Sequence, residues 1–150
     1  MISKTRAIVK KHDSTGAIKS TNLLDPEFIY LATSNARCAN FEIYIKEGEH
    51  VDLHQVIGIR HAAFFDQPIH STVSGEFIGL EKHYHRNGKL IDFIKIKNDF
   101  KYTEHESIKE RSDDEIKKLS REQAMEILKD KAMVGLGGSS FPTYVKFQTK

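Results

Sequence analysis

Short apolar segments interrupted by glycines run through the middle of the chain, and they limit its fold more than any other feature. Residues 28–31 and 41–45 form two such segments, and residues 67–80 repeat the plan after further turns. Strand-length apolar runs at this close spacing are typical of a small barrel or sandwich, and not of a parallel α/β sheet. We therefore predict a mainly β fold for the centre of this 150-residue chain.

The dipeptide Asn87-Gly88 is the strongest hairpin signal in the sequence. The strand that follows it, residues 90–97, is rich in isoleucine and phenylalanine. A two-residue turn at this dipeptide places His83 opposite Asp92. We therefore predict a β-hairpin with a cross-strand polar pair between these two side chains.

Two capping boxes follow a charged connector at residues 101–111. In each box a serine precedes a glutamate or glutamine by three residues, as in Ser112 with Glu115 and Ser120 with Gln123. This spacing predicts a short helix from about residue 113 and a main helix from about 121 to 132. Together with the strands, these signals predict an α+β chain, mainly β with a C-terminal helix.

A glycine-rich stretch at residues 135–143 follows the predicted main helix. Gly135, Gly137 and Gly138 have no side chain to pack, so they fit a backbone that turns sharply or approaches a ligand closely. Pro142 then stiffens the exit from the stretch. An equally good alternative is a helix C-cap glycine followed by a linker. A dinucleotide-binding fingerprint is excluded, because that glycine motif follows a strand.

Composition narrows the functional classes. A net charge of +2, 39% hydrophobic residues and no apolar run of membrane-spanning length predict a soluble protein. We therefore expect no nucleic-acid partner and no direct membrane insertion. One cysteine, Cys38, rules out an internal disulfide and a cysteine-ligated cluster within this sequence, and its small neighbours predict a buried, unreactive thiol. The eight histidines form no ligand pattern, so we predict no metal site and no catalytic residue.

The central region resembles a biotinyl/lipoyl-type half-barrel, on the rhythm of glycines and apolar residues in 45–51, 56–58 and 69–78. A carrier domain of that type places a lysine in the hairpin between the two halves. Here residues 61–67 occupy that hairpin and include no lysine. The resemblance therefore implies a barrel-sandwich hybrid that serves as a scaffold, and not a swinging-arm carrier.

The order of barrel, charged connector, capped helix and residues 134–146 resembles the N-terminal part of the RnfC family, which supplies one subunit of the Rnf electron-transport complex. The element GxGGxxFPTxxK is also shared with the flavin-binding subunit of respiratory complex I. This resemblance covers residues 25–147 and implies three parts. These are an N-terminal segment (1–25), a barrel-sandwich hybrid domain (26–100), and a connector, helix and glycine-rich loop (101–150) that begin a flavin- and NADH-binding domain.

The resemblance implies that FMN and NADH bind at the glycine-rich loop. The residues that match the family's motif are Gly135, Gly137, Gly138, Phe141, Pro142, Thr143 and Lys146. Two departures are Ser139-Ser140, where the family has Ala-Gly, and Leu136, where complex I relatives carry an arginine. The two serine hydroxyls are able to donate to a phosphate.

The implied function is that of an N-terminal fragment of an electron-transfer subunit that moves electrons between NADH, FMN and iron–sulfur centres. The parent would belong to an NADH:ferredoxin-type oxidoreductase, with its cluster ligands beyond this sequence and the fragment inactive alone. Expected partners are other subunits of the complex or a redox protein, in the cytoplasm and peripheral to the membrane through those subunits. An alternative stays open, in which a non-catalytic barrel-sandwich module docks on a redox partner.

Overall fold

The computed structural model describes residue 19 and residues 25–35, 37–136 and 139–148. Nearly all of the predicted N-terminal segment, residues 1–25, lies outside this part of the chain, as do Gly137 and Gly138.

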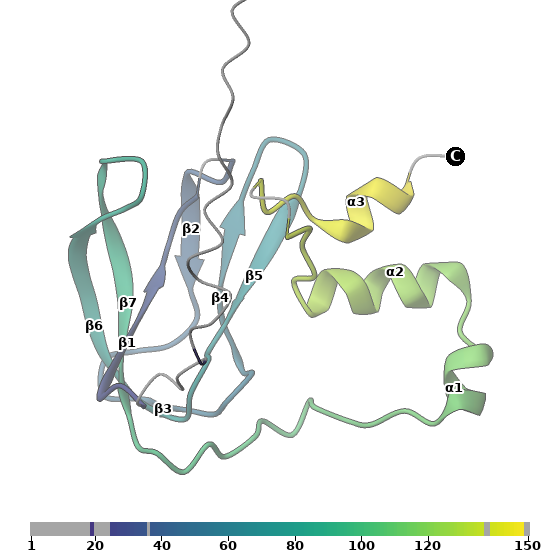
Figure 1. Ribbon diagram of the computed structural model, residues 1–150, viewed down its shortest axis with the longest axis horizontal. Helices are drawn as coiled ribbons and strands as arrows, with labels where there is room; N and C mark the ends of the chain where they lie inside the picture. Colours follow the sequence, from purple (N-terminus) through teal and green to yellow (C-terminus); the bar gives the residue numbers. More distant parts are fainter. Residues whose placement is uncertain (1–18, 20–24, 36, 137–138, 149–150) are drawn as a thin grey trace, which may run out of the picture.

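Two antiparallel sheets make up the body of the structure (Figure 1). The first sheet has the order β1 (Phe28–Ala32), β7 (Leu90–Asn98), β6 (Gly75–Tyr84) and β3 (His50–Val51). The second has the order β2 (Asn40–Ile43), β4 (Val56–His61) and β5 (Asp66–His70). A connector then leads to α1 (Asp113–Lys117), α2 (Arg121–Asp130) and α3 (Thr143–Gln148). The predicted fold class, mainly β with a C-terminal helical part, is confirmed.

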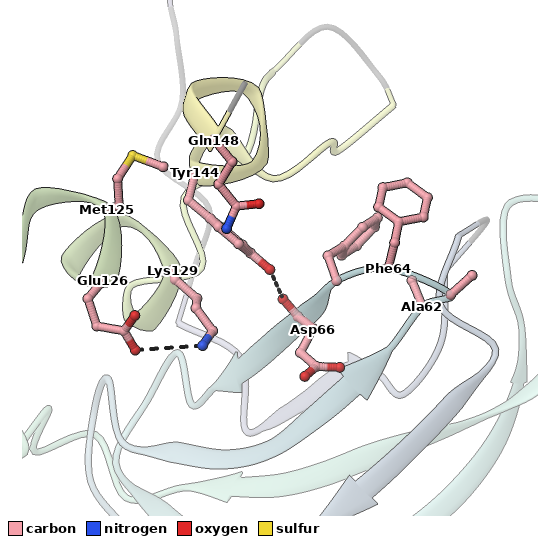
Figure 2. A pocket seen from close by; sticks show the side chains of 10 residues that line it. Ala62, Phe64, Asp66, Met125, Glu126, Lys129, Tyr144 and Gln148 are labelled. Atoms are coloured by element: carbon pink, nitrogen blue, oxygen red, sulfur yellow. Dashed lines mark hydrogen bonds and ion pairs between the residues drawn. The ribbon is translucent and has the colours of Figure 1, made fainter. Parts of the chain in front are cut away.

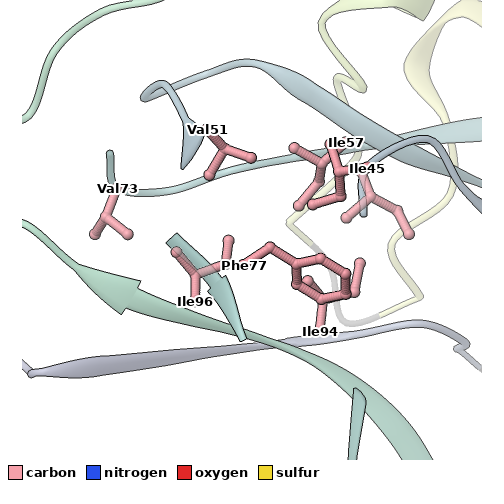
Figure 3. Close-up of a cluster of buried hydrophobic side chains, with 8 residues drawn as sticks. Ile45, Val51, Ile57, Val73, Phe77, Ile94 and Ile96 are labelled. Carbon is pink, nitrogen blue, oxygen red and sulfur yellow. The ribbon is translucent and has the colours of Figure 1, made fainter. Parts of the chain in front are cut away.

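The main core lies between the two sheets (Figure 3). Alternate residues of β6 and β7 point inward, and they meet side chains from β3, β4 and β5. The buried members are Ile45, Val51, Ile57, Ile69, Val73, Phe77, Ile94 and Ile96. Burial of each such side chain stabilises the fold by about 1.5–3 kcal/mol relative to exposure, so this cluster is the main source of stability for the sandwich.

The predicted hairpin between β6 and β7 is confirmed, but its turn is not the two-residue turn that Asn87-Gly88 suggested. The carbonyl of His85 accepts from the Gly88 N–H at 2.8 Å, and the His85 N–H donates to the Lys89 carbonyl at 2.8 Å. Gly88 has a φ of 77°. This is a three-residue loop, in which a turn is followed by a glycine in the left-handed region.

The longer loop moves the register by one residue, so the predicted pairing of His83 with Asp92 is wrong. His83 lies opposite Ile91, and Asp92 lies opposite Lys82. The Lys82 ammonium contacts the Asp92 carboxylate at 2.8 Å. A polar cross-strand pair therefore exists, but with a lysine in place of the histidine.

Both predicted helices are present, and both serines cap them as expected. The hydroxyl of Ser112 accepts from the Glu115 N–H, and that of Ser120 accepts from the Gln123 N–H. The main helix ends at Asp130, two residues before the predicted end, and Ala132 has a φ of 48°. The third helix, α3, carries no capping box and was not predicted.

Asp99 is held as a carboxylate at one end of the sandwich. Its oxygens accept from the Ser74 hydroxyl at 2.7 Å and the Lys101 N–H at 2.9 Å, and His50 Nε2 lies 3.0 Å away. The hydrogen bond from Ser74, followed by those from Lys101 and His50, lowers the pKa of Asp99 from 3.8 to about 2. A lowered pKa in the folded state contributes stability above the unfolded pKa, and that stability is lost as the pH falls toward 2.

We expect Asp99→Asn to reduce the free energy of unfolding at neutral pH and to have progressively less effect as the pH falls from about 4 toward 2, because protonation removes the same charge. Urea denaturation at a series of pH values measures the difference between wild type and variant. Glu106→Gln, at an exposed position of the connector, is the control. An Asp99→Asn effect that stays constant across this pH range contradicts the assignment.

Candidate functional site

The glycine-rich stretch is a closed loop between α2 and α3. Val134 and Pro142 pair as an antiparallel bridge, and the Gly135 N–H donates to the Phe141 carbonyl at 3.0 Å. The Thr143 N–H donates to the Met133 carbonyl at 2.8 Å. The C-cap of α2 is Lys131, so Gly135 does not cap that helix. The alternative of a C-cap glycine followed by a linker is therefore wrong.

Lys146 and Gly135 come together in this loop, although eleven positions separate them in the sequence. A Cβ atom at Gly135 would lie 3.1 Å from the Nζ atom of Lys146, closer than most Cβ contacts. The absence of a side chain at Gly135 thus allows the lysine, which extends from α3, to pass close to the loop backbone. These two candidate residues form the basic part of the site.

Phe141 is half-buried and packs in two directions. Its ring meets that of Phe65 edge to face, with 5.9 Å between centroids. The guanidinium carbon of Arg37 lies 5.3 Å from the centroid of the Phe141 ring. Arg37 thus adds a second cation beside the loop. No local signal in the sequence points to it, because it comes from the segment between β1 and β2.

A second core joins the loop and helices to the barrel. Its buried members are Cys38, Phe65 and Tyr144. Around them pack Ala62, Met125, Leu128, Phe141 and Val145. The predicted domain boundary at residues 100 and 101 stays a prediction, but this core contains residues from both sides of it.

The tip of the β4–β5 hairpin supplies the barrel's part of that core. The Ala62 N–H donates to the Phe65 carbonyl at 2.9 Å and closes the tip. Phe65 is 7% exposed, whereas its neighbour Phe64 is 67% exposed. The Tyr144 hydroxyl donates to the Asp66 carbonyl at 3.2 Å. The hairpin in which a carrier domain bears its lysine is here fixed against α3.

A pocket of about 410 Å3 opens at this contact, between the hairpin tip, α2 and α3. Figure 2 shows Tyr144 reaching across it to the backbone of Asp66. Glu126 and Lys129 of α2 form an ion pair at 3.6 Å on one wall. The pocket therefore has both acidic and basic groups on its walls, and its floor is the contact between barrel and helices.

Cys38 is fully buried in the second core, as the sequence predicted. Burial raises the pKa of its thiol, so the neutral form dominates at physiological pH. The Asn35 side chain accepts from the N–H groups of Arg37 at 2.8 Å and Cys38 at 2.9 Å, and thereby shapes the turn that carries both. Cys38 is thus a packing residue beside the loop.

The loop residues in the described part fit a phosphate group through side chains. The N–H groups of Gly135 and Thr143 already donate within the loop, so they do not serve as phosphate donors. The Lys146 ammonium supplies a positive charge, and Ser139 is exposed with its hydroxyl as a donor. The flavin- and nucleotide-binding roles of all six candidate residues stay predictions, and Gly137 and Gly138 lie outside the described residues.

Within residues 25–35, 37–136 and 139–148, no three His, Cys, Asp or Glu side chains gather in a way suited to a metal ion. No helix in that part of the chain combines the length and apolar character needed to cross a membrane.

Two facing antiparallel sheets with a helical extension define the class of barrel-sandwich hybrid domains. A family model described as the RnfC barrel sandwich hybrid domain matches residues 6–101, and the chain belongs to this family. The chain is similar to the RnfC-type subunit of the Na+-translocating ferredoxin:NAD+ oxidoreductase complex of Acetobacterium woodii, at 30% identity over 121 residues. The match covers 81% of this chain and 27% of the relative, so the chain spans about a quarter of that relative's length.

Proposed function

We propose that this chain is the barrel-sandwich part of an RnfC-like subunit in an electron-transport complex, and that its glycine-rich loop binds the phosphate of FMN or NADH. Family membership and the name of the relative, an oxidoreductase subunit that works with ferredoxin and NAD+, support the first half. The complete subunit would pass electrons between NADH, FMN and iron–sulfur centres. Cluster ligands would come from outside this sequence, since Cys38 is its one cysteine.

The observation that carries the proposal is the contact between barrel and loop. Phe65 at the hairpin tip packs on Phe141 of the loop, and Tyr144 of α3 bonds to the next residue of the hairpin. A barrel that supports a loop in this way needs no attachment lysine, which explains its loss from residues 61–67. The barrel then acts as the scaffold that holds Lys146 and the glycines in place.

We expect Lys146→Gln to weaken FMN binding about tenfold or more. A hydrogen bond to a charged group contributes about 1.5–3 kcal/mol, and 1.4 kcal/mol corresponds to a factor of about ten in Kd. Titration of the chain into FMN, followed by flavin fluorescence, measures the dissociation constant.

Lys117→Gln, at an exposed lysine of α1, is the matched control because it removes the same charge away from the loop. FMN binding that is saturable in wild type, weakened in Lys146→Gln and unchanged in Lys117→Gln supports the proposal. Saturable binding with equal affinity in all three proteins contradicts the role of Lys146.

A non-catalytic docking module is the second candidate function, and the surface of the C-terminal part favours it. Large apolar side chains are exposed on or beside α1, α2 and α3, and Leu136 in the loop is 98% exposed. The others are Ile116, Met133 and Phe147. Such a group of exposed apolar residues is typical of a surface that packs against another protein. Other subunits of the complex, or a redox protein, are the partners that this proposal assigns to it.

The relative's complex translocates Na+, which is a membrane function. The proposal therefore places this chain at the cytoplasmic side of a membrane, attached through other subunits. Reconstitution with those subunits separates the two candidates. A docking module retains association when FMN binding is absent, and loses it on Leu136→Asp.

A further inference from the structure

A second pocket lies on the other side of α2 from the glycine-rich loop. Its volume is about 350 Å3, and it is formed by β4, β5, the connector and the end of α2. The residues that line it are Val56, Pro68, His70, Ser107, Arg111, Ile127, Asp130 and Lys131. Met125, Glu126 and Lys129 of the same helix line the first pocket, so the two sites occupy different faces of α2.

Two cations converge on this pocket from different parts of the chain. Arg111 comes from the connector before α1, and Lys131 is the C-cap of α2. Of the ion pairs within the described part of the chain, none includes Arg111 or Lys131. The carboxylate of Asp130 is the single acidic group on the wall. The pocket therefore has an excess of positive charge.

Two polar groups add hydrogen-bonding capacity. Burial, and then the nearby charge of Lys131, lowers the pKa of His70 below its usual 6.5, while the backbone carbonyl of Asp130 and its carboxylate act in the opposite direction. His54 is the other nearby charge, and it also lowers the pKa of His70. His70 is therefore neutral at pH 7 and offers a ring N–H or an acceptor. The hydroxyl of Ser107 lies on the same wall.

The remaining wall is apolar. Val56 of β4, Pro68 of β5 and Ile127 of α2 contribute aliphatic surface to the pocket. A few placed polar groups on an otherwise apolar surface are typical of small-molecule sites. The charged groups favour an anionic head, and the aliphatic wall favours an apolar body joined to it.

We propose that this pocket binds a small organic anion, a carboxylate or phosphate carried on an apolar group, with its head between Arg111 and Lys131. The proposal goes beyond the function of the glycine-rich loop and does not rest on it. The two anionic heads share the same recognition chemistry, in which a guanidinium pairs with two oxygens.

The test is an NMR titration of the full chain at pH 7, with backbone amide shifts as the readout. Phenyl phosphate and benzoate are the probes, since they place the two heads on the same ring. Inorganic phosphate tests the head alone. We expect saturable shifts at the Ser107, Ile127 and Lys131 amides, and tighter binding of at least one ring-bearing probe than of inorganic phosphate.

Arg111→Gln is expected to weaken the tighter-binding probe about tenfold, because a hydrogen bond to a charged group is lost. Lys89→Gln, in the β6–β7 turn, removes the same charge far from the pocket and should leave binding unchanged. Shifts that fail to saturate for every probe, or affinities that do not differ between wild type and Arg111→Gln, overturn the proposal. Equal affinity for inorganic phosphate and both ring-bearing probes overturns the role of the apolar wall.

Discussion

Phe65→Ala is expected to lower the free energy of unfolding by about 3–5 kcal/mol, the usual cost of truncating a buried phenylalanine. The ring of Phe65 is 7% exposed, and it packs against Phe141 of the loop and within the cluster that contains Tyr144 and Cys38. Its loss leaves a cavity at the contact between the barrel and the C-terminal helices. Urea denaturation measures the change in free energy.

Phe64→Ala is a matched control, because it removes the same side chain one residue earlier, at a position that is 67% exposed. We expect a change of about 0.5 kcal/mol or less for that variant. Hydrogen exchange adds a local readout. The amides of Gly135 and Thr143, which donate within the loop, should lose protection in Phe65→Ala and keep it in Phe64→Ala. Similar effects of the two substitutions contradict the account of the hairpin tip.

Gly75→Ala is the second substitution with a large expected effect. Gly75 begins β6 between Val51 of β3 and Asn98 of β7. A Cβ atom there would lie 2.0 Å from the carbonyl oxygen of Lys97, a backbone atom that has no alternative rotamer. The strands must separate to admit the methyl group, so we expect a loss of about 3 kcal/mol or more in the free energy of unfolding.

Gly88→Ala separates the steric clash from the loss of glycine as such. Gly88 has a φ of 77°, but a Cβ atom there would meet nothing within 4 Å. We expect only the cost of a left-handed backbone for alanine, about 1–2 kcal/mol. Thermal or urea unfolding of the two variants, compared with wild type, gives the measurement. A Gly75→Ala effect no larger than that of Gly88→Ala would show that the sheet accommodates the side chain.

Features that depend on neighbouring residues were predictable from the sequence. The two capping boxes located α1 and α2, because a cap is a contact between residues three apart. The hairpin between β6 and β7 followed from Asn87-Gly88, yet its register did not. The dipeptide is compatible with two-residue and three-residue loops, and the hydrogen bond from Gly88 to His85 selects the longer one.

Features that depend on distant residues were not predictable. Phe65 and Tyr144 meet in one core although 79 positions separate them, and nothing in residues 61–67 announces which phenylalanine is buried. Arg37 reaches the Phe141 ring from a turn shaped by Asn35. The glycine motif indicated a site, but only the folded chain shows that the Gly135 N–H is used internally and that Lys146 lies beside Gly135.

The most direct test of the central claim is an NMR titration of the isotope-labelled chain with FMN. The account predicts saturable shifts at the amides of Gly135, Ser139 and Lys146, with smaller changes on the strands of the sandwich. Saturable shifts confined to the sandwich, or no saturable shift at any amide, would contradict the assignment of the glycine-rich loop as the binding site.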